Sequence, residues 1–397
     1  MLNNEIIPHD LCTGCSACYA SCPVSCIKMG YDKEGFIFPV KGDECINCGL
    51  CKKVCPRNNL TGTAPITFTQ LAYAAKSKNK RIWRSSTSGG VFYELCRAWN
   101  RNGDTLFVGA TWDGFTVKHA CVQRLDEIKR FSKSKYIQSE MGDAFKDIKN
   151  WLGAGNWVVF SGTPCQVSGL KAYLGDESSR ILYIDLICHG VGSNLVFRDC
   201  LKIVESQIKE KIISYSFRTK GIFFEKDHIA KIITESNKKI LLSSDPYLEL
   251  FVNQTCLRKS CGKNCIYRTA SRQGDITIGD FKGLAQVFPS FTGSKYNYST
   301  IVINTKKGEN ALELSDNAME LHRCSVEDIE RYNPIFSRHT FFSKDRDEFF
   351  EKYIDNPIKA INEITNDIVY HKRSLKSIVY MLLPKYVRAQ LIKRRLK

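Results

Sequence analysis

The sequence lacks the segments that would carry a chain into or across a membrane. No apolar run reaches the roughly 20 residues that a transmembrane helix requires. The N-terminus, MLNNEIIPHDLC, has no basic start, apolar stretch or small-residue cleavage site, so it does not resemble a secretory signal. We therefore expect a soluble, cytoplasmic protein. A chain of 397 residues is long enough for a small module and one large domain.

Acidic residues are also scarce relative to basic ones. The chain has 58 Lys and Arg against 41 Asp and Glu, a formal net charge of +17. Residues 1–60 carry six of each sign, so the basic excess lies beyond them and suits acidic partners. There is no zinc-finger spacing, RNP-like aromatic motif or interleaving of basic and aromatic residues. We expect no nucleic-acid partner.

Cysteine is abundant, and its spacing indicates iron. In a long chain without an export signal, 18 cysteines are metal ligands or catalytic thiols rather than disulfides. The spacing C-x2-C-x2-C-x3-C-P occurs twice and is typical of bacterial two-cluster ferredoxins, in which the fourth cysteine of each run ligates the other cluster. The spacing predicts one 4Fe-4S cluster on Cys12, Cys15, Cys18 and Cys55, and a second on Cys45, Cys48, Cys51 and Cys22.

Two alternatives to this interpretation are weaker. Structural zinc also uses C-x2-C pairs, but two complete runs, each followed by a proline (Pro23 and Pro56), favour the clusters. Cys26 is a surplus cysteine, and packing as a small apolar residue is favoured over ligation. The residues between the runs predict a short helix at Cys26 and a hairpin around Phe36.

The rest of the chain predicts a larger α/β domain. Polar residues 61–70 form a linker, and β-rich runs at 105–110, 157–160 and 181–187 alternate with helical patterns at 90–100 and 141–152. The predicted architecture is an α+β ferredoxin-like N-terminal module followed by a larger α/β domain, for which the family resemblance described below implies flavin binding. Its predicted domains are 1–60, a two-cluster 4Fe-4S ferredoxin; 61–70, a linker; 71–337, the large domain; and 338–397, a helical extension.

Four segments of the large domain come where strands end and glycine-rich or polar turns begin, which is where open α/β folds place ligands. Taken singly, each is as easily an ordinary turn. The four segments are RSSTSGGVF at 84–92, SKYIQS at 134–139, FSGTPCQVSGL at 160–170 and DLICHGVGS at 185–193. The first can hold phosphate because free amides precede a helix.

Cysteines gather again in the large domain. Cys165 and Cys188 stand at strand ends, and Cys261 and Cys265 form a nearby pair. Four soft ligands of this kind suit a third iron-sulfur site, whereas isolated cysteines are commonly just buried. Four others sit in apolar or helical patterns and are assigned to packing: Cys96, Cys121, Cys200 and Cys324.

Together these segments resemble the coenzyme F-420 hydrogenase/dehydrogenase beta-subunit family. The resemblance extends over 71–283, to the family's SSSGG, SKYVQS, FSGTPCQ, DLxCHGVxS and DITxGDFWG patterns, and the ferredoxin module is common among its members. Two departures stand out. The family's C-x2-C pair is x3 here, with Cys256 as a rival ligand, and Lys282 replaces the tryptophan of DFWG.

The resemblance implies an FAD- and iron-sulfur-dependent oxidoreductase. Its clusters would relay electrons to a non-covalent FAD, which exchanges a two-electron equivalent with a deazaflavin or an organic substrate. It implies FAD-binding residues at three turns: Ser86, Ser88, Gly89, Gly90, Lys135, Tyr136, Gln138, Gly162 and Thr163. If a proton donor is needed near the flavin, His189 and Lys135 are the candidates. The redox partner would be ferredoxin or a reduced deazaflavin.

Other interpretations stay open. Similar fusions occur in bacterial polysaccharide gene clusters, which implies a sugar-type substrate as one option. The rival function is an electron-transfer subunit without its own substrate site. A third possible function is that of a scaffold protein that has lost its flavin, and the replacement of the family's tryptophan by Lys282 is the feature that supports it. Residues 371–397 hold nine Lys and Arg and no acidic residue, typical of either a helix closing the core or a peripheral membrane contact; we favour the first.

Overall fold

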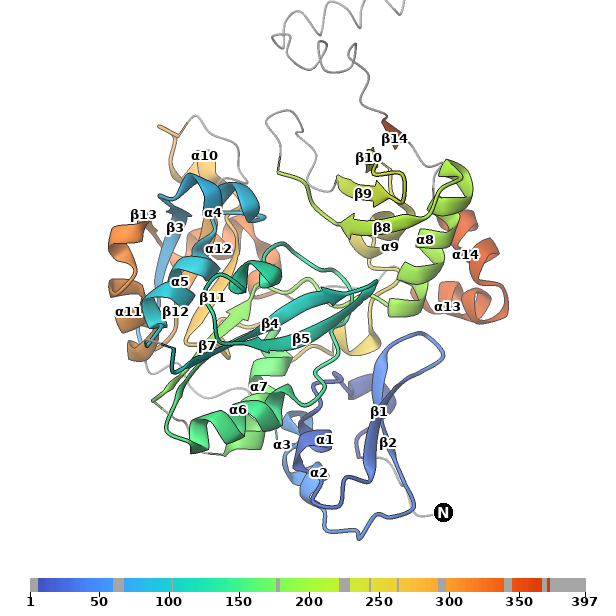
Figure 1. Cartoon of the computed structure of the whole chain (residues 1–397), viewed down its shortest axis with the longest axis horizontal. Coiled ribbons are helices and arrows are strands. Elements are labelled where there is room, and N and C mark those ends of the chain that lie inside the picture. The colour runs from blue at the N-terminus through green and yellow to red at the C-terminus, as the bar shows by residue number, and fades with distance from the viewer. Residues whose placement is uncertain are drawn as a thin grey trace, which may run out of the picture.

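The structure is a computed structural model of the whole chain (Figure 1). It describes residues 6–59, 68–101, 103–175, 179–220, 229–242, 244–262, 264–291, 298–338, 345–365 and 370–371. Most of the predicted linker, and the basic tail apart from His371, lie outside the described residues. In the described part of the chain, no helix has both the length and the apolar character to cross a membrane.

The N-terminal module is a hairpin flanked by short helices, and the hairpin was predicted. Strands β1 and β2 pair antiparallel, with Gly30 opposite Phe38. The short helix predicted at Cys26 is wrong, because that residue leads directly into β1. The elements of the module are η1 (His9–Leu11), α1 (Ala17–Ser21), β1 (Ile27–Tyr31), β2 (Ile37–Lys41), α2 (Leu50–Lys53) and α3 (Pro56–Asn59).

An eight-stranded mixed sheet forms the centre of the large domain, with the order β13-β3-β12-β11-β7-β6-β4-β5. The neighbours β4, β6, β7 and β11 run parallel, and antiparallel strands complete both edges. The strands are β3 (Leu71–Ser77), β4 (Thr105–Asp113), β5 (Thr116–Val122), β6 (Trp157–Gly162), β7 (Ile181–Leu186), β11 (Ile276–Asp280), β12 (Ser299–Ile303) and β13 (Met319–Cys324). The strands predicted at 105–110, 157–160 and 181–187 are confirmed as β4, β6 and β7.

Helices cover both faces of the central strands. Alternate residues of β6 show this, because Val159 packs on one face and Val158 and Phe160 on the other, as the two-residue period of a strand requires. One face carries α5 (Val91–Trp99) and α11 (Lys306–Glu313), and the other α6 (Ala144–Gly153) and α7 (Pro164–Leu174). The helices predicted at 90–100 and 141–152 are confirmed as α5 and α6. The N-terminal module, blue in Figure 1, lies against α6 and α7.

A second, four-stranded antiparallel sheet has the order β14-β10-β9-β8. It shares a hydrophobic core with α8 and α13, in which Phe197, Tyr247 and Phe349 are fully buried. The elements of this part are α8 (Asn194–Ile208), β8 (Ile212–Ser216), β9 (Ala230–Thr234), β10 (Lys239–Leu242), α9 (Pro246–Val252), α13 (Arg346–Asp355), α14 (Pro357–Ile364) and β14 (Tyr370–His371). Short helices complete the described chain: α4 (Lys80–Ser85), η3 (Ile128–Phe131), η4 (Lys259–Cys261), α10 (Leu284–Val287), η5 (Asp316–Ala318), α12 (Val326–Tyr332) and η6 (Pro334–Phe336).

Candidate iron-sulfur sites and the motif cluster

The first cysteine group, Cys12, Cys15, Cys18 and Cys55, lines one small cavity of the N-terminal module. The chain reverses at Gly14, whose positive φ of 66° suits glycine, and the Gly14 amide donates to Cys12 Sγ at 3.4 Å. Burial raises the pKa of the Cys15 thiol to about 12, and Cys12 and Cys55 raise it further. Burial therefore favours the neutral thiol form of Cys15, and a metal that binds there must displace its proton. Cys55 comes from the second run, so the structure brings together the crossed set that the spacing predicts.

The second cysteine group, Cys22, Cys45, Cys48 and Cys51, lies nearer the surface. Cys48 is exposed and the other three are half-buried. Cys45 and Cys48 both raise the pKa of Cys51, although burial is the larger cause. The surplus Cys26 is buried here, with its Sγ 3.4 Å from Cys22 Sγ. Its neighbours include Cys45, so Cys26 packs against this group and not in a distant part of the module.

Both groups fit a polynuclear cluster. A 4Fe-4S cluster takes one thiolate at each of its four irons, so its ligands do not converge on one point. Among the described residues, no group of three or more His, Cys, Asp or Glu side chains is arranged to hold a metal ion. What the module offers is two sets of four sulfur ligands, the donor type that iron-sulfur clusters take.

Buried polar side chains fasten the module to the large domain. Arg258, only 3% exposed, donates from Nε to the Cys12 carbonyl at 2.7 Å and from Nη1 to the Ile37 carbonyl at 2.8 Å. Gln138 accepts from the Ile37 amide at 2.9 Å and donates to the Thr13 carbonyl at 3.3 Å. The Gln138 amide, predicted to bind flavin, is thus engaged with the N-terminal module.

A second fastening point lies at the hairpin turn. Arg346, 1% exposed, forms an ion pair with Glu34 and donates to the Leu257 carbonyl at 2.7 Å. The Ser193 hydroxyl also donates to the Glu34 carbonyl, at 2.5 Å. Sequence reasoning did not find the roles of Arg258 and Arg346, because an arginine that donates to main-chain carbonyls belongs to no motif.

The third cysteine group, Cys165, Cys188, Cys261 and Cys265, comes together from three separate segments. Cys165 is in the first turn of α7, Cys188 follows β7, and Cys261 ends η4. All four thiols are half-buried. Burial raises the pKa of Cys261 to about 12, and Cys188 and Cys265 raise it further. Burial likewise raises the pKa of Cys165, and the other three cysteines of the group add to the effect.

Two buried arginines lie beside this group. Burial raises the pKa of Cys188, and Arg268 and Arg272 oppose that effect. Arg268 donates to the His189 carbonyl at 2.5 Å, and Arg272 donates to the Leu186 carbonyl at 2.8 Å. Fixed positive charges of this kind favour the thiolate form that ligates metal.

Cys256 is not part of this group. It is fully buried in the core shared by α8 and the four-stranded sheet. Its carbonyl accepts from the Ser193 amide at 3.0 Å, and burial raises the pKa of its thiol to about 12. Of the rival ligands considered from the sequence, the structure places Cys261 and Cys265 with Cys165 and Cys188, and Cys256 among apolar side chains.

The four predicted turn segments meet along residues 134–139. At one end, the Ser134 amide donates to Thr87 Oγ1 at 3.0 Å, which joins this segment to the serine-rich turn before α5. At the other end, Gln166 donates to Ser139 Oγ at 2.9 Å, which joins it to the turn before α7. In the middle, Gln138 donates its main-chain amide to the Gly192 carbonyl at 3.1 Å. We call these converging segments the motif cluster.

Several predicted flavin residues make hydrogen bonds within the protein. Ser86 donates to the Ile82 carbonyl at 2.8 Å, and Ser88 to the Tyr298 carbonyl. Gly89 packs so closely that a Cβ there would collide with the Ala75 carbonyl oxygen. The Thr163 amide donates to Gln166 Oε1 at 2.9 Å. These bonds fix the shape of the turns and leave Gly90, with φ of 84°, to start α5.

The two predicted proton donors differ in setting. Burial lowers the pKa of Lys135 to about 7, and Lys133 lowers it further. Lys135 Nζ is nevertheless directed at main-chain carbonyls, the nearest being Ser132 at 2.9 Å. The His189 ring packs against Phe251, with ring centroids 5.2 Å apart. Lys135 therefore stabilises a turn, while His189 adjoins Cys188 of the third group.

A further cationic pair was missed from the sequence. Arg218 forms an ion pair with Asp280, and Lys220 donates to the Trp83 carbonyl at 2.8 Å and to the Ser88 carbonyl at 2.5 Å. Lys220 Nζ also lies 4.1 Å from the centre of the Trp83 ring. Burial lowers the pKa of Lys220 to about 7, with Arg218 as the next cause. Both side chains come from the end of β8, which carries no recognisable motif.

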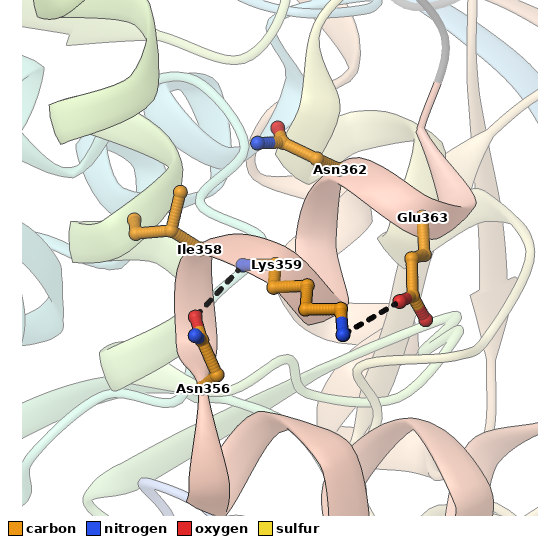
Figure 2. Close-up of a pocket in the computed structure, with 5 residues that line it drawn as sticks. All are labelled: Asn356, Ile358, Lys359, Asn362 and Glu363. Atoms are coloured by element: carbon orange, nitrogen blue, oxygen red, sulfur yellow. Dashed lines mark hydrogen bonds and ion pairs between the residues drawn. The ribbon is translucent and has the colours of Figure 1, made fainter.

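The surface cavity in Figure 2 is separate from all these groups. It is lined by α14 and its N-cap, and its residues are Asn356, Ile358, Lys359, Asn362 and Glu363. Asn356 Oδ1 accepts from the Lys359 amide at 3.1 Å, which is the capping bond of that helix. The cavity therefore shows helix-end geometry and carries none of the predicted ligands.

Comparison with known proteins agrees with the two sets of motifs. Residues 11–59 match the 4Fe-4S dicluster domain, and residues 155–330 match the C terminus of the coenzyme F420 hydrogenase/dehydrogenase beta subunit. These matches define an iron-sulfur protein of the oxidoreductase class. The chain therefore resembles the coenzyme F420 hydrogenase/dehydrogenase beta subunit over its central region and carries a segment similar to a 4Fe-4S dicluster domain at its N-terminus.

Individual relatives are distant. One of the subunits of F(420)H(2) dehydrogenase from Methanosarcina mazei is 22% identical over 340 residues, covering 80% of this chain and 86% of that protein. Coenzyme F420-dependent sulfite reductase of Methanocaldococcus jannaschii is 25% identical over 351 residues, covering 84% of this chain but 50% of that protein. A chain of the F420-reducing [NiFe] hydrogenase complex from Methanosarcina barkeri superimposes with a TM-score of 0.45 and 18% identity, covering 75% of this chain and 90% of that chain.

Proposed function

We propose that this protein relays electrons through three 4Fe-4S clusters to an FAD, which reduces or oxidises a deazaflavin coenzyme. The observation that carries the proposal is the arrangement of the third cysteine group. Cys165 lies in the turn that opens α7, and that same turn belongs to the motif cluster. Sulfur ligands therefore border the segments proposed to hold the flavin. A flavin joins one-electron clusters to two-electron chemistry, which clusters alone do not perform.

The start of α5 is the place proposed for the FAD phosphates. Gly90 begins this helix, and in the described part of the chain no side chain caps its first amides. Free amides at a helix N-terminus attract phosphate. Lys220, which contacts the Ser88 carbonyl in the same turn, adds positive charge. We assign Ser88, Gly89 and Gly90 to the phosphates and residues 134–136 to the remainder of the cofactor.

Among the predicted proton donors, the proposal favours His189. It directly follows Cys188 of the third cysteine group, and an imidazole ring can both donate and accept a proton. Lys135 instead points at the carbonyls of 130–133, so we propose that it holds the serine-rich and SKYIQS turns in register.

A deazaflavin is preferred to a sugar-type substrate because two relatives carry F420 chemistry in their names. The second candidate function is an electron-transfer subunit that needs another subunit for its substrate site. It is favoured by the relative from Methanosarcina mazei, which is named as one of several subunits of a dehydrogenase. Both functions require the clusters. They differ in whether the isolated chain catalyses turnover of its substrate.

The test is one anaerobic preparation. Purified protein would be assayed for iron and acid-labile sulfide, and its released flavin would be identified by chromatography. FAD with about twelve irons per chain supports the proposal, and about eight irons removes the third cluster. Turnover of a reduced deazaflavin by the isolated protein separates the enzyme from the electron-transfer subunit. A folded preparation with its clusters but without flavin contradicts the oxidoreductase mechanism.

A further inference from the structure

Helix α7 connects the first and third cysteine groups. It begins with Pro164 and carries Cys165 in its first turn. Gly169 follows four residues later, so it lies on the same face of the helix, about 6 Å along its axis. The first turn of α7 thus carries a cysteine of the third group, one turn of helix away from Gly169.

Gly169 contacts the first cysteine group. A Cβ built on Gly169 would lie 2.8 Å from Cys15 Sγ and 2.9 Å from Cys15 Cβ. Such a contact is shorter than carbon and sulfur atoms tolerate, so only a glycine lets Cys15 sit directly on the helix. Gly169 is buried, and Ala17 from the module packs into the same hydrophobic core as Val167 and Leu170.

Tyr267 lies near both of these groups. Its side chain is only 3% exposed. It interacts electrostatically with both Cys165 and Cys15, and Ser168 of α7 is its hydroxyl neighbour. A buried aromatic side chain is therefore close to sulfur atoms of both groups.

A third connection joins the remaining ligands. Arg57 Nη1 donates to the Asn264 carbonyl at 3.0 Å. Arg57 is two residues after Cys55 of the first group, and Asn264 directly precedes Cys265 of the third group. The contact thus holds together two loops that each carry a ligand.

We propose that electrons pass directly between the cluster of the first group and the cluster of the third group, across Gly169 and Tyr267. The step rests on the proposed function, because it requires a cluster in the third group. One electron leaves the reduced first cluster and enters the oxidised third cluster, and no bond or proton changes place. The second cluster, with its exposed Cys48, is then the outer end that meets the redox partner.

The test uses two pairs of matched variants of the whole holoprotein. Gly169→Ala pushes Cys15 away from α7, and Gly153→Ala is its control, since no atom lies within 4 Å of a Cβ built there. Tyr267→Leu removes the ring, and Tyr267→Phe keeps it; this pair serves if Gly169→Ala does not fold. Each preparation is assayed for iron. The fully reduced protein is then examined by electron paramagnetic resonance for spin coupling between the clusters of the first and third groups. Freeze-quench samples after mixing with reduced ferredoxin follow how fast the third cluster is reduced.

The expected result has three parts. The parent protein holds about twelve irons per chain, its first and third clusters are spin-coupled, and the fast phase of third-cluster reduction is lost in Gly169→Ala and Tyr267→Leu while both controls keep it. About eight irons overturns the inference together with the third cluster. Twelve irons without coupling, or a fast phase that all variants keep, overturns the inference alone and leaves the proposed function standing.

Discussion

The N-terminal module and the third cysteine group use the same ligand in opposite ways. The module takes eight cysteines from residues 12–55, at spacings that the backbone of a single turn satisfies. The third group takes four cysteines from residues 165–265, and β7 and several helices must pack correctly before the thiols meet. A cluster site built from local spacing can be recognised from the sequence, whereas one built by the fold depends on long-range packing.

The surroundings of the two sites differ as well. In the module, Cys48 is exposed, and short helices with few buried residues surround the second group. At the third group, the buried side chains of Arg268 and Arg272 stand beside Cys188. The exposed module is therefore suited to exchange electrons with other molecules. The enclosed third group is suited to a cluster that keeps its electrons inside the protein.

The sharpest way to break this comparison is to remove a thiol of the third cysteine group. We expect Cys261→Ala to lose iron, up to about four atoms per chain, because it removes one of the four thiolates proposed to hold the third cluster. The matched variant Cys256→Ala removes a thiol five residues earlier that is fully buried among apolar side chains, and it should keep all its iron. Iron and sulfide analysis of both proteins decides the matter. Equal iron in the two variants would show that Cys261 is not a ligand.

The next largest effect concerns the order in which clusters are lost. Because Cys48 is exposed, we expect the second cluster to disappear first when the protein is exposed to air or to an iron chelator. The third cluster should persist longer. Electron paramagnetic resonance spectra taken during the exposure would follow each signal separately. Simultaneous loss of all signals would mean that the exposure of Cys48 has no kinetic consequence.

The joint between the two regions is tested by Arg258→Gln. The change removes the guanidinium donors to the carbonyls of Cys12 and Ile37, and hydrogen bonds to charged groups are worth roughly 1.5 to 3 kcal/mol each. We expect the free energy of unfolding to fall by about 3 kcal/mol or more, and the module to melt before the large domain. Calorimetry of the holoprotein measures both. Arg124→Gln, which breaks an exposed ion pair with Asp126, should change stability far less, because solvent screens that pair.

The smallest effect is a pH dependence of the large domain. Burial lowers the pKa of His119 to about 4, and Lys135 opposes its charging further. Since the pKa of an unfolded histidine is about 6.5, the unfolded chain binds more protons between pH 6.5 and 4, and stability falls as the pH falls through that range. Complete protonation costs about 3 kcal/mol. His119→Phe should flatten the fall in melting temperature over this range.

The fold was predictable where one segment carries its own signal. Short β-rich runs identified β4, β6 and β7, and the doubled cysteine run identified the module. Long-range contacts were not predictable. Gln138 lies in a motif that suggested flavin, yet its side chain bonds to the module 101 residues away. Tyr267 and Lys220 belong to no pattern, because their importance comes from what packs beside them.

The pairing of Arg346 with Glu34 spans 312 residues of sequence, and this has a consequence for biosynthesis. The N-terminal module has left the ribosome long before its partner side chains are made. At typical synthesis rates of roughly 5 to 20 residues per second, the delay is on the order of 15 to 60 seconds. During that time the eight thiols are complete but Arg258 and Arg346 do not yet cover the module. Iron delivery to the nascent chain therefore has its widest access before the last helices are translated, and docking then closes over loaded clusters.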